Sequence, residues 1–348
     1  MAMAMAMAMA MAMAMAMAMA MAMAMAMAMA MAMAMAMTMT MSVLICFYIN
    51  QDKSMTFYGS VDEDTKTNIF NILGIKEGPL PVRYLDNCKS PIAGSKKGDE
   101  VKGLGQIKQF LIKYGYLNPS INVDESEVLD HPMEEAVKKF QLFYNLDVSG
   151  ELDEKTLSLM SKPRCGCPDL VNGTMVKHGM KMVLDQLKGS YYVTGTKWPK
   201  LNLSWAIKPG TRGDAYKPIY WAIRRWALVT KFNFTNINDF TQSDLKIAFY
   251  KRSHGDSGPF DGPGGILAHA GMPPDGGVHF DADENWVIGA HPTGVDIESV
   301  AVHELGHSLG LGHSTVKEAV MWPYIGYGEV KHNLNVDDIA GIKALYHF

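Results

Sequence analysis

Cysteine is scarce in this sequence, with four residues among 348. Two of the four stand two positions apart, at Cys165 and Cys167, so the sequence does not predict the disulfide framework of a small secreted domain. Cys88 is left to pair with Cys46 or Cys167, or with neither. An excess of positive charge is also absent, because the formal net charge is −4. We therefore expect no nucleic-acid partner.

Charge is missing altogether from residues 1–49, which begin with an alternation of methionine and alanine and end in SVLICFYI. This uncharged stretch is longer than a membrane-spanning helix requires, but the basic start of an ordinary signal peptide is missing. We interpret residues 1–49 as an extended export signal, with a signal anchor as the alternative. The chain is then predicted to be secreted, and membrane association is expected only through this segment.

Three segments beyond residue 97 carry apolar side chains at helical spacing, whereas residues 50–97 show no sustained period. The segments are GLGQIKQFLIKYG, MEEAVKKFQLF and EKTLSLM, and Asp153 directly precedes the last of them as a helix cap. Short helices that share an apolar seam predict a small helical bundle over residues 98–162.

The remainder of the chain mixes the periodicities of strands and helices. Alternation predicts strands over Lys200–Ile207, Leu245–Phe249 and Gly276–Phe280, and helical spacing predicts helices over Ala215–Thr230, 303–312 and Val336–Leu345. This order of elements predicts one α+β domain with a single core.

Residues 303–313 read HELGHSLGLGH, a pattern that indicates a metal site. His303 and His307 are one helical turn apart and face the same way, so they can share one divalent cation, and Glu304 between them is placed as a general base. Gly310 lets the chain leave the helix and bring in His313 as a third ligand. Three imidazoles leave the fourth position of tetrahedral Zn²⁺ open, which is typical of a catalytic zinc.

A second group of ligand-type residues lies upstream of this motif. Three imidazoles and one carboxylate are enough to close a tetrahedral zinc site, and they come from His254, Asp256, His269 and His279. A glycine-rich turn lies among them, and its carbonyls together with Asp261, Asp281 and Glu284 offer the oxygen ligands that Ca²⁺ prefers. The alternative is a surface loop that is rich in histidine and aspartate without binding metal.

The pattern HExxHxxGxxH followed by a methionine marks the metzincin proteases, and Met321 follows His313 within AVMWP. Residues 191–348 resemble the catalytic domain of a matrix metalloproteinase, and IESVAVHELGHSLGLGHS at 297–314 is similar to the plant members. The resemblance implies a twisted mixed sheet with three helices and no hemopexin-like domain. It also implies a zinc-dependent endopeptidase that acts on proteins or peptides as a monomer in the extracellular matrix or apoplast.

The same resemblance assigns metal ligands residue by residue. A catalytic zinc falls on His303, His307 and His313, with Glu304 as the catalytic residue, and a structural zinc falls on His254, Asp256, His269 and His279. A calcium ion falls on oxygens of Asp261, Gly262, Gly264, Ile266, Asp281 and Glu284, and Asp244 is the candidate for a second calcium.

Further roles follow from the resemblance as well. Met321 lies beneath the ligands as the Met-turn, and Ala268, Pro323 and Tyr324 contact the substrate. Maturation is expected near Ser190–Tyr191, after which the new amino terminus pairs with Asp337.

Residues 163–169 read PRCGCPD and resemble the matrixin cysteine switch. The resemblance makes Cys165 the zinc ligand of the latent form and pairs Arg164 with Asp169 as a clamp, within an activation segment over 163–190. Cys167 stands where the family carries an apolar residue, so a CxC structural metal or disulfide element remains the alternative. The preceding passage AVKKFQLFYNLDVSGELDEKTLSLM resembles a peptidoglycan-binding-like domain, which forms the propeptide in this family.

Two rival functions are considered beside a protease. One is a catalytically inactive zinc protein that binds glycans or partners through residues 98–160, and the intact Glu304 argues against it. The other is a metzincin of the astacin or adamalysin type, against which the PRCGCPD segment and the upstream histidine cluster argue.

Overall fold

The computed structural model describes residues 46–49, 54–58, 76–77, 92–119, 127–170, 175–177, 180–182 and 195–348. The chain divides into two units, Met1–Pro79 and Leu80–Phe348. In the first unit, strands β1 (Cys46–Ile49), β2 (Ser54–Tyr58) and β3 (Lys76–Glu77) form one sheet. Apart from β1, the predicted export signal lies outside the described residues. Within the described part, no helix has the length and apolar character needed to cross a membrane.

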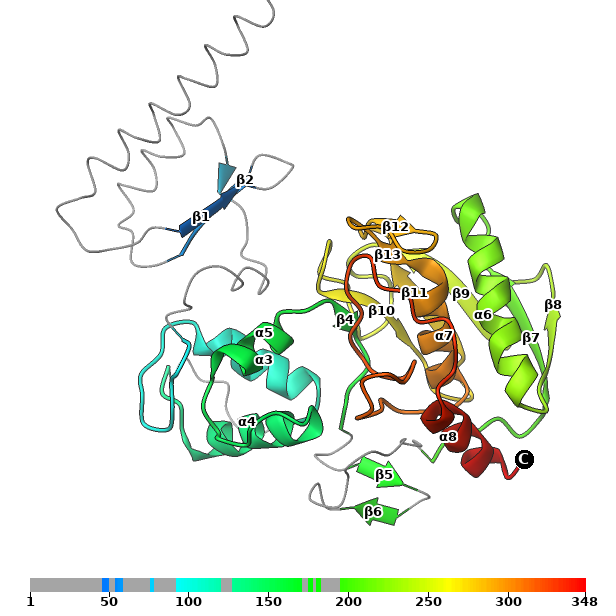
Figure 1. Cartoon of the computed structure of the whole chain (residues 1–348). Helices are drawn as coiled ribbons and strands as arrows, with labels where there is room; N and C mark the ends of the chain where they lie inside the picture. The colour runs from blue at the N-terminus through cyan, green and yellow to red at the C-terminus, as the bar shows by residue number, and fades with distance from the viewer. Residues whose placement is uncertain are drawn as a thin grey trace, which may run out of the picture. The chain divides into compact units, whose positions relative to one another are not determined.

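A bundle of three helices opens the second unit (Figure 1). Its helices are α3 (Leu104–Lys113), α4 (His131–Phe143) and α5 (Glu154–Met160). Asp130 caps α4 by accepting a hydrogen bond from Met133 N–H at 3.0 Å, and Asp153 caps α5 through Thr156 N–H at 2.8 Å. The apolar faces meet in a buried core, as the spacing predicted, with Leu104, Leu111, Val137 and Phe140 at its centre.

The end of α3 is shaped to receive the segment that follows the bundle. The helix stops before Gly115, which adopts a left-handed conformation with φ +87°. A Cβ at this position would lie 2.1 Å from the carbonyl oxygen of Leu170, so only glycine allows the close approach. The backbone N–H groups of Asp169 and Leu170 both donate to the carbonyl of Tyr114 at 3.1 Å.

A six-stranded mixed sheet forms the rest of the second unit, in the order β4-β10-β11-β9-β7-β8. Its strands are β4 (Arg164–Cys165), β7 (Asn202–Ile207), β8 (Asn233–Asn236), β9 (Leu245–Tyr250), β10 (Ile266–Ala270) and β11 (Gly277–Asp281). Only the β10–β11 pair is antiparallel among the described strands of this sheet. The short pairs β5 (Met175–Lys177) with β6 (Met180–Met182), and β12 (Trp286–Val287) with β13 (Val295–Asp296), lie outside it.

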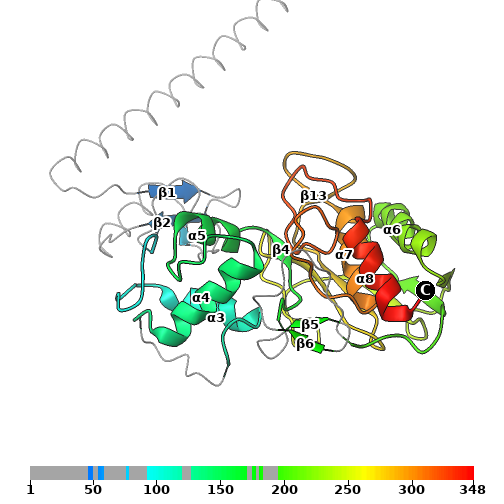
Figure 2. The same cartoon turned by 60° about the horizontal axis from the view of Figure 1, so that its bottom comes forward.

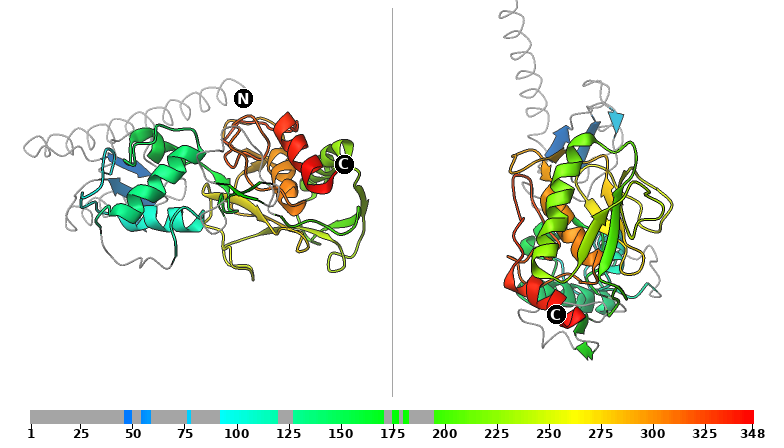
Figure 3. Two further views of the ribbon diagram at one scale, coloured as in Figure 1. Left: turned by 90° about the horizontal axis from the view of Figure 1, so that it is seen from below. Right: turned by 90° about the vertical axis from the view of Figure 1, so that its right-hand side faces the viewer.

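Helices α6 (Tyr216–Val229) and α7 (Ile297–Ser308) lie side by side on one face of this sheet (Figure 3). The 3-10 turn η2 (Gly213–Ala215) leads into α6, and α8 (Val336–Tyr346) is the last helix. Trp226 is fully buried between α6 and α7, and its indole N–H donates to the carbonyl of Val302 at 2.8 Å. The predicted α+β fold with a mixed sheet and three helices is therefore confirmed.

Two local differences from the sequence expectation bear on the site. The helix expected at 303–312 begins earlier, at Ile297, and ends at Ser308, so His313 lies beyond it. Ala268, expected to contact the substrate, lies in β10, and β4 covers this side of β10 by pairing parallel with it (Figure 2). A segment that follows the helical bundle thus becomes the outermost strand of the sheet.

Candidate metal centres and active site

Helix α7 is the element that presents the predicted catalytic residues. Its N-cap is Asp296, whose carboxylate accepts hydrogen bonds from Ser299 N–H at 2.8 Å, Gly289 N–H at 2.6 Å and His332 Nε2 at 2.5 Å. Burial alone would raise the pKa of Asp296, but these hydrogen bonds outweigh it and lower the pKa. The start of the helix is therefore fixed by a buried carboxylate that receives several donors.

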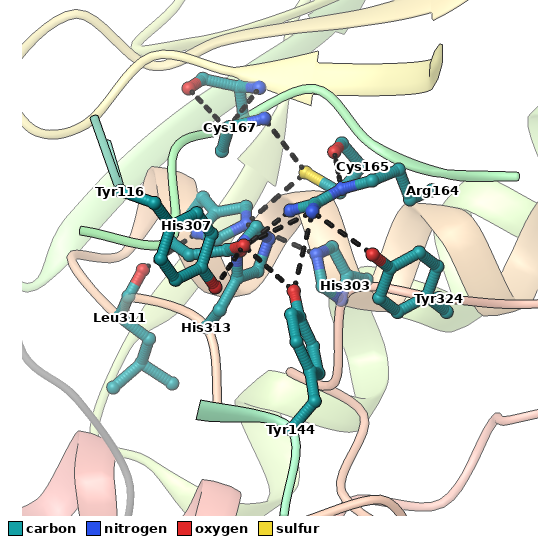
Figure 4. Close-up of polar contacts among 12 residues, drawn as sticks. Tyr116, Tyr144, Arg164, Cys165, Cys167, His303, His307, Leu311, His313 and Tyr324 are labelled. Carbon is teal, nitrogen blue, oxygen red and sulfur yellow. Dashed lines mark hydrogen bonds and ion pairs between the residues drawn. The ribbon is translucent and has the colours of Figure 1, made fainter. Parts of the chain in front are cut away.

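The three imidazoles of the motif converge at their Nε2 atoms (Figure 4). His307 Nε2 lies 3.1 Å from His303 Nε2 and 3.1 Å from His313 Nε2. The other ring nitrogen of each faces an acceptor, because His303 Nδ1 donates to Val320 O at 2.7 Å and His307 Nδ1 to Leu311 O at 2.8 Å. His313 reaches the point from outside the helix, after the turn at Gly310 with φ +103°.

This arrangement fits a divalent cation. The acceptors at Nδ1 hold the ring protons there, so the three Nε2 lone pairs point at one another and cannot all be satisfied by hydrogen bonds. Tetrahedral Zn²⁺ with bonds of 2.0–2.1 Å would separate its nitrogens by about 3.3 Å. Burial lowers the pKa of His303 and lowers that of His313 to about 4, which keeps both rings neutral as a metal requires.

His307 differs from the other two ligands because it faces two thiols. Burial lowers its pKa, but the charge and hydrogen bond from Cys167 outweigh burial and raise the pKa to about 9. A cation bound among the three nitrogens would compete with this proton for the same lone pair.

Glu304 lies on α7 between the two helical ligands and is fully buried. Neither oxygen of its carboxylate has a hydrogen-bond partner in the described part of the chain, although the Cys165 sulfur lies nearby. Burial, reinforced by the charge of Cys167, raises the pKa of Glu304 to about 8. The pKa of this carboxyl group is thus close to neutral pH, which suits a side chain that takes up and releases protons.

Strand β4 delivers Cys165 to the three histidines. Arg164 N–H donates to Gly265 O and Gly166 N–H to Ala268 O on one side, and Cys165 N–H donates to Pro323 O on the other. The Cys165 sulfur lies 3.4 Å from His307 Nε2, and it forms a group with all three imidazoles in which the ligand atoms are within 4.8 Å of one another. Cys167 forms a group of this kind with His307 but not with His303 or His313 among the described residues. The geometry therefore favours Cys165 as the fourth ligand.

Arg164, which precedes Cys165 in the chain, forms a buried ion pair with Asp169. Arg164 Nη2 lies 2.6 Å and Nη1 3.1 Å from the carboxylate, and the two side chains are 2% and 0% exposed. The hydroxyls of Tyr116 and Tyr144 each donate to Asp169 Oδ2 at 2.8 Å. Burial raises the pKa of Asp169, but Arg164 and the other donors hold it well below the usual range.

A further partner of Asp169 is the third histidine, a contact that the sequence did not predict. His313 Nδ1 donates to Asp169 Oδ1 at 2.7 Å. The carboxylate belongs to the segment after the bundle, whereas His313 belongs to the sheet domain, so the pair joins two parts that are 144 residues apart. No local spacing signals such a contact.

The residues expected to contact substrate lie beside Cys165. The strand β10 main chain at Ala268 and the Pro323 carbonyl both bind the β4 segment, as described above, and the Tyr324 hydroxyl lies 3.4 Å from Arg164 Nη1. A pocket opens next to them, lined among others by Cys165, His303, Glu304, Trp322, Tyr324 and Ile325. The β4 segment therefore binds the main-chain groups that were expected to contact the substrate.

The upstream residues form a second convergent group. Asp256 Oδ2 lies 2.9 Å from a ring nitrogen of each of His254, His269 and His279. His254 Nδ1 donates to Arg252 O at 2.8 Å, which leaves its Nε2 lone pair directed at the group. Burial raises the pKa of Asp256 and the imidazoles lower it, with a net decrease. Four donors about 3 Å apart fit a closed tetrahedral zinc site.

Comparison with known proteins gives the family. A matrixin family model matches residues 197–347, and the model named "Putative peptidoglycan binding domain" matches residues 100–160. Metalloendoproteinase 5-MMP of Arabidopsis thaliana is 37% identical over 323 residues, which cover 87% of this chain and 85% of that protein. Metalloendoproteinase 1 of Glycine max is 39% identical over 72% of this chain and 83% of that protein. Matrix metalloproteinase-16 of Homo sapiens is 37% identical over 69% of this chain and 41% of that protein.

This chain belongs to the matrixin family. Matrixins are zinc-dependent metalloendoproteinases, so the predicted enzyme class and the plant-type resemblance are confirmed. The helical bundle corresponds to the peptidoglycan-binding-like module expected before the catalytic domain.

The acidic loop of this matrixin, expected to bind calcium, is only partly arranged for a cation. Asp281 accepts hydrogen bonds from Gly262 N–H at 3.1 Å and Asp283 N–H at 2.8 Å, and Glu284 accepts one from Gly264 N–H. Asp261 Oδ1 accepts from Ile266 N–H at 2.9 Å. Burial raises the pKa of Asp281, as expected of crowded carboxylates. Arg252 donates to the Asp261 carbonyl at 2.6 Å and places positive charge on the same loop.

Asp244, expected at a second calcium, interacts with Ser204 and Lys200 in the structure. Its carboxylate accepts hydrogen bonds from Ser204 N–H at 2.8 Å and Ser204 Oγ at 2.9 Å, and it pairs with Lys200 Nζ at 2.6 Å. Among the described residues, Asp244 joins no group of three or more metal-ligand side chains. In the structure Asp244 ties β7 to β9.

Two remaining predicted residues support the zinc helix of this matrixin. Met321 is buried beneath α7, where a Cβ on Gly306 would come 2.3 Å from its sulfur. Asp337 accepts a hydrogen bond from Ser314 Oγ at 2.6 Å, one residue after His313. Its predicted partner, the mature amino terminus near Ser190–Tyr191, lies outside the described residues.

Proposed function

We propose that this matrixin is a secreted endopeptidase, made as a latent proenzyme, that cleaves proteins of the extracellular matrix or the cell wall. The observation that carries the proposal is the convergence of three Nε2 atoms, with His307 3.1 Å from each of the other two, beside a buried Glu304 whose carboxylate has no hydrogen-bond partner among the described residues. His303, His307 and His313 would hold the catalytic zinc, and the bound ion would supply Lewis acidity to the scissile carbonyl.

In the proposed mechanism, Glu304 takes the proton of the attacking water and passes it to the leaving amine. Its pKa of about 8 in the latent form shows that burial already opposes the carboxylate charge there. Solvent admitted on removal of β4 would weaken this effect and favour the carboxylate form that accepts a proton. The main chain of residues 265–268 would bind an extended substrate, since the Gly265 and Ala268 carbonyls already accept hydrogen bonds from the Arg164 and Gly166 N–H groups.

Latency is proposed to result from the same contacts. Cys165 occupies the position opposite the three histidines, and β4 occupies the substrate edge. The Arg164–Asp169 ion pair fixes Cys165 in place through its neighbouring residue. Cleavage near Ser190–Tyr191 would release the segment, and pairing of the new terminus with Asp337 would then support the mature form.

The other metals and the assembly state are also proposals. His254, Asp256, His269 and His279 would hold a second, structural zinc. Calcium would be held by oxygens of Asp261, Gly262, Gly264, Ile266, Asp281 and Glu284. We propose a monomer that acts on protein or peptide substrates, and that associates with membranes, if at all, through residues 1–49 only.

The test measures zinc and peptide cleavage on the same protein. The Glu304→Gln variant of the full chain should keep the zinc content of the parent, because Glu304 is assigned proton transfer and no metal bond. After proteolytic processing, the parent should cleave a quenched peptide and the variant should lose activity by about a hundredfold or more. Normal turnover by processed Glu304→Gln would contradict the assignment. Loss of zinc from the variant would show that Glu304 has a structural role.

A further inference from the structure

Cys167 is a second thiol at the catalytic site, and the mechanism above gives it no role. Its sulfur lies 3.4 Å from both the N–H and the carbonyl of Ala270, at the end of β10. It also belongs to a group with Cys165, Glu304 and His307 in which the ligand atoms are within 4.8 Å of one another. Both cysteines are buried and both are free thiols.

The two sulfurs are within reach of a direct bond. Residues two apart have Cα atoms at most about 7 Å from each other, close to the separation that disulfides span. Cys167 N–H already donates to the Cys165 sulfur at 3.3 Å, so the chain turns back on itself between them. A Cβ on Gly166 would lie 2.6 Å from Ile266 Cγ2, so the residue between the cysteines is one that lets the turn approach β10.

We propose that Cys165 and Cys167 are an oxidation site, at which a peroxide converts the switch thiol into a Cys165–Cys167 disulfide and releases latency. The inference rests on the proposed latency of the proenzyme. Cys165 sulfur attacks the peroxide, the O–O bond breaks, and a sulfenic acid and one water form. Cys167 sulfur then attacks this sulfenic sulfur, and the S–S bond forms as a second water leaves. Two thiols lose two electrons in total, and hydrogen peroxide is reduced to two waters.

Access to Cys165 comes from the substrate side. Cys165 lines the pocket that also contains His303 and Glu304, so a small peroxide can reach its sulfur without unfolding the propeptide. Cys167 contacts the Ala270 main chain and is not among the residues that line this pocket, which leaves Cys165 as the first thiol to be oxidised.

The disulfide would remove the inhibitory ligand however the side chains rearrange. If Cys165 turns toward Cys167, its sulfur moves away from His307 Nε2, to which it lies at 3.4 Å in the thiol form. If Cys167 turns instead, the Cys165 sulfur stays in place but can no longer be a thiolate, and the thiolate is the form that binds metal. Because Cys167 converts the sulfenic acid into a disulfide, the oxidation stops at a form that an added thiol can reduce. Without Cys167, the sulfenic acid would be oxidised further to sulfinic acid.

The experiment follows mass and activity separately. The full-length Glu304→Gln proenzyme, which cannot process itself, is treated with hydrogen peroxide, alkylated and digested with trypsin. Both cysteines fall in one peptide, Cys165–Lys177. We expect this peptide to lose about 2 Da, to resist alkylation and to recover both thiols with dithiothreitol. In Cys167→Val and Cys167→Ser, the same peptide should instead gain about 32 Da that dithiothreitol does not remove.

Activity is measured on the wild-type proenzyme in parallel. Peptide cleavage should rise as the disulfide forms and fall again on reduction, without a change in chain length. Free thiols after peroxide, a bond from either cysteine to Cys46 or Cys88, or equal sulfinic acid in wild type and Cys167→Val would overturn the inference. Protease activity after proteolytic processing but no disulfide refutes this inference alone. Lack of activity even after processing refutes the proposed function, whatever the masses show.

Discussion

Replacing Asp169 by asparagine should give the proposed proenzyme peptidase activity without any proteolytic cleavage. The carboxylate receives Arg164 at 2.6 Å, the Tyr116 and Tyr144 hydroxyls at 2.8 Å and His313 Nδ1 at 2.7 Å. Asparagine keeps the shape and one acceptor oxygen, but it removes the charge and turns an N–H₂ group toward other donors. The Arg164 guanidinium is then buried without a counter-charge.

The size of the effect follows from complete burial. Removing one partner of a buried ion pair costs about 3–5 kcal/mol. The remaining amide oxygen retains some of the hydrogen bonds, so we take the lower end, about 3 kcal/mol. Since each 1.4 kcal/mol is a factor of ten, the ratio of released to docked propeptide should rise about a hundredfold. Unprocessed Asp169→Asn should therefore cleave a quenched peptide about a hundredfold faster than the unprocessed parent.

Intact mass at the end of the assay confirms that the chain is unprocessed. The matched control is Asp147→Asn in the same bundle, because Asp147 pairs with Lys155 at 3.3 Å but is 85% exposed. That exposed pair contributes well under about 1 kcal/mol, so the control should stay latent. The double variant Arg164→Met with Asp169→Leu removes both charges and should recover part of the latency that Asp169→Asn loses. Latency of Asp169→Asn equal to that of Asp147→Asn would refute the reasoning.

Three further predictions concern the catalytic domain. Gly306→Ala should lower the free energy of unfolding by about 1–3 kcal/mol, because the new methyl group meets Met321 and Trp226 in a packed core. The control is Gly105→Ala in α3, where the new methyl group meets no other atom and should cause no such loss. Chemical denaturation measures the free energy of unfolding of both variants. Asp296→Asn should cost about 2 kcal/mol near pH 7. Because the folded pKa of Asp296 is lowered, its stabilisation is present above the unfolded pKa of about 3.9 and is lost as pH falls through the folded pKa. The deficit of the variant should thus vanish at low pH, and a deficit that persists in acid would count against this view. His279→Ala should reduce metal content from about two zinc ions to about one by elemental analysis, and an unchanged zinc count would rule out the second site.

The helical bundle and the general fold were predictable because their signals are local. Apolar residues at helical spacing and the capping Asp153 marked the bundle, and α5 begins directly after that cap. Helix α7 was placed too late because residues on every side of it are buried, so its first turns show no polar face to give a period. Its N-cap at Asp296 was the available signal for the true start.

Contacts between distant segments could not be read from the sequence. Arg164 and Cys165 form a strand only because β10, about 100 residues later, supplies partners for their backbone. Tyr116 follows α3 and Tyr144 follows α4, so the two tyrosines on Asp169 meet only after the bundle has folded. A motif can name the members of the switch, but the partners that bury it depend on tertiary packing.

The three zinc-site histidines differ in where their outer hydrogen bonds come from. His303 and His307 donate from Nδ1 to carbonyls of Val320 and Leu311, which belong to the catalytic domain and would remain after the proposed maturation. His313 donates to Asp169, which lies before the expected cleavage near Ser190–Tyr191. Outer partners of metal-binding histidines orient the ring and fix its tautomer. Activation by the proposed route therefore opens the fourth position and, in the same step, removes the acceptor that orients the third ligand.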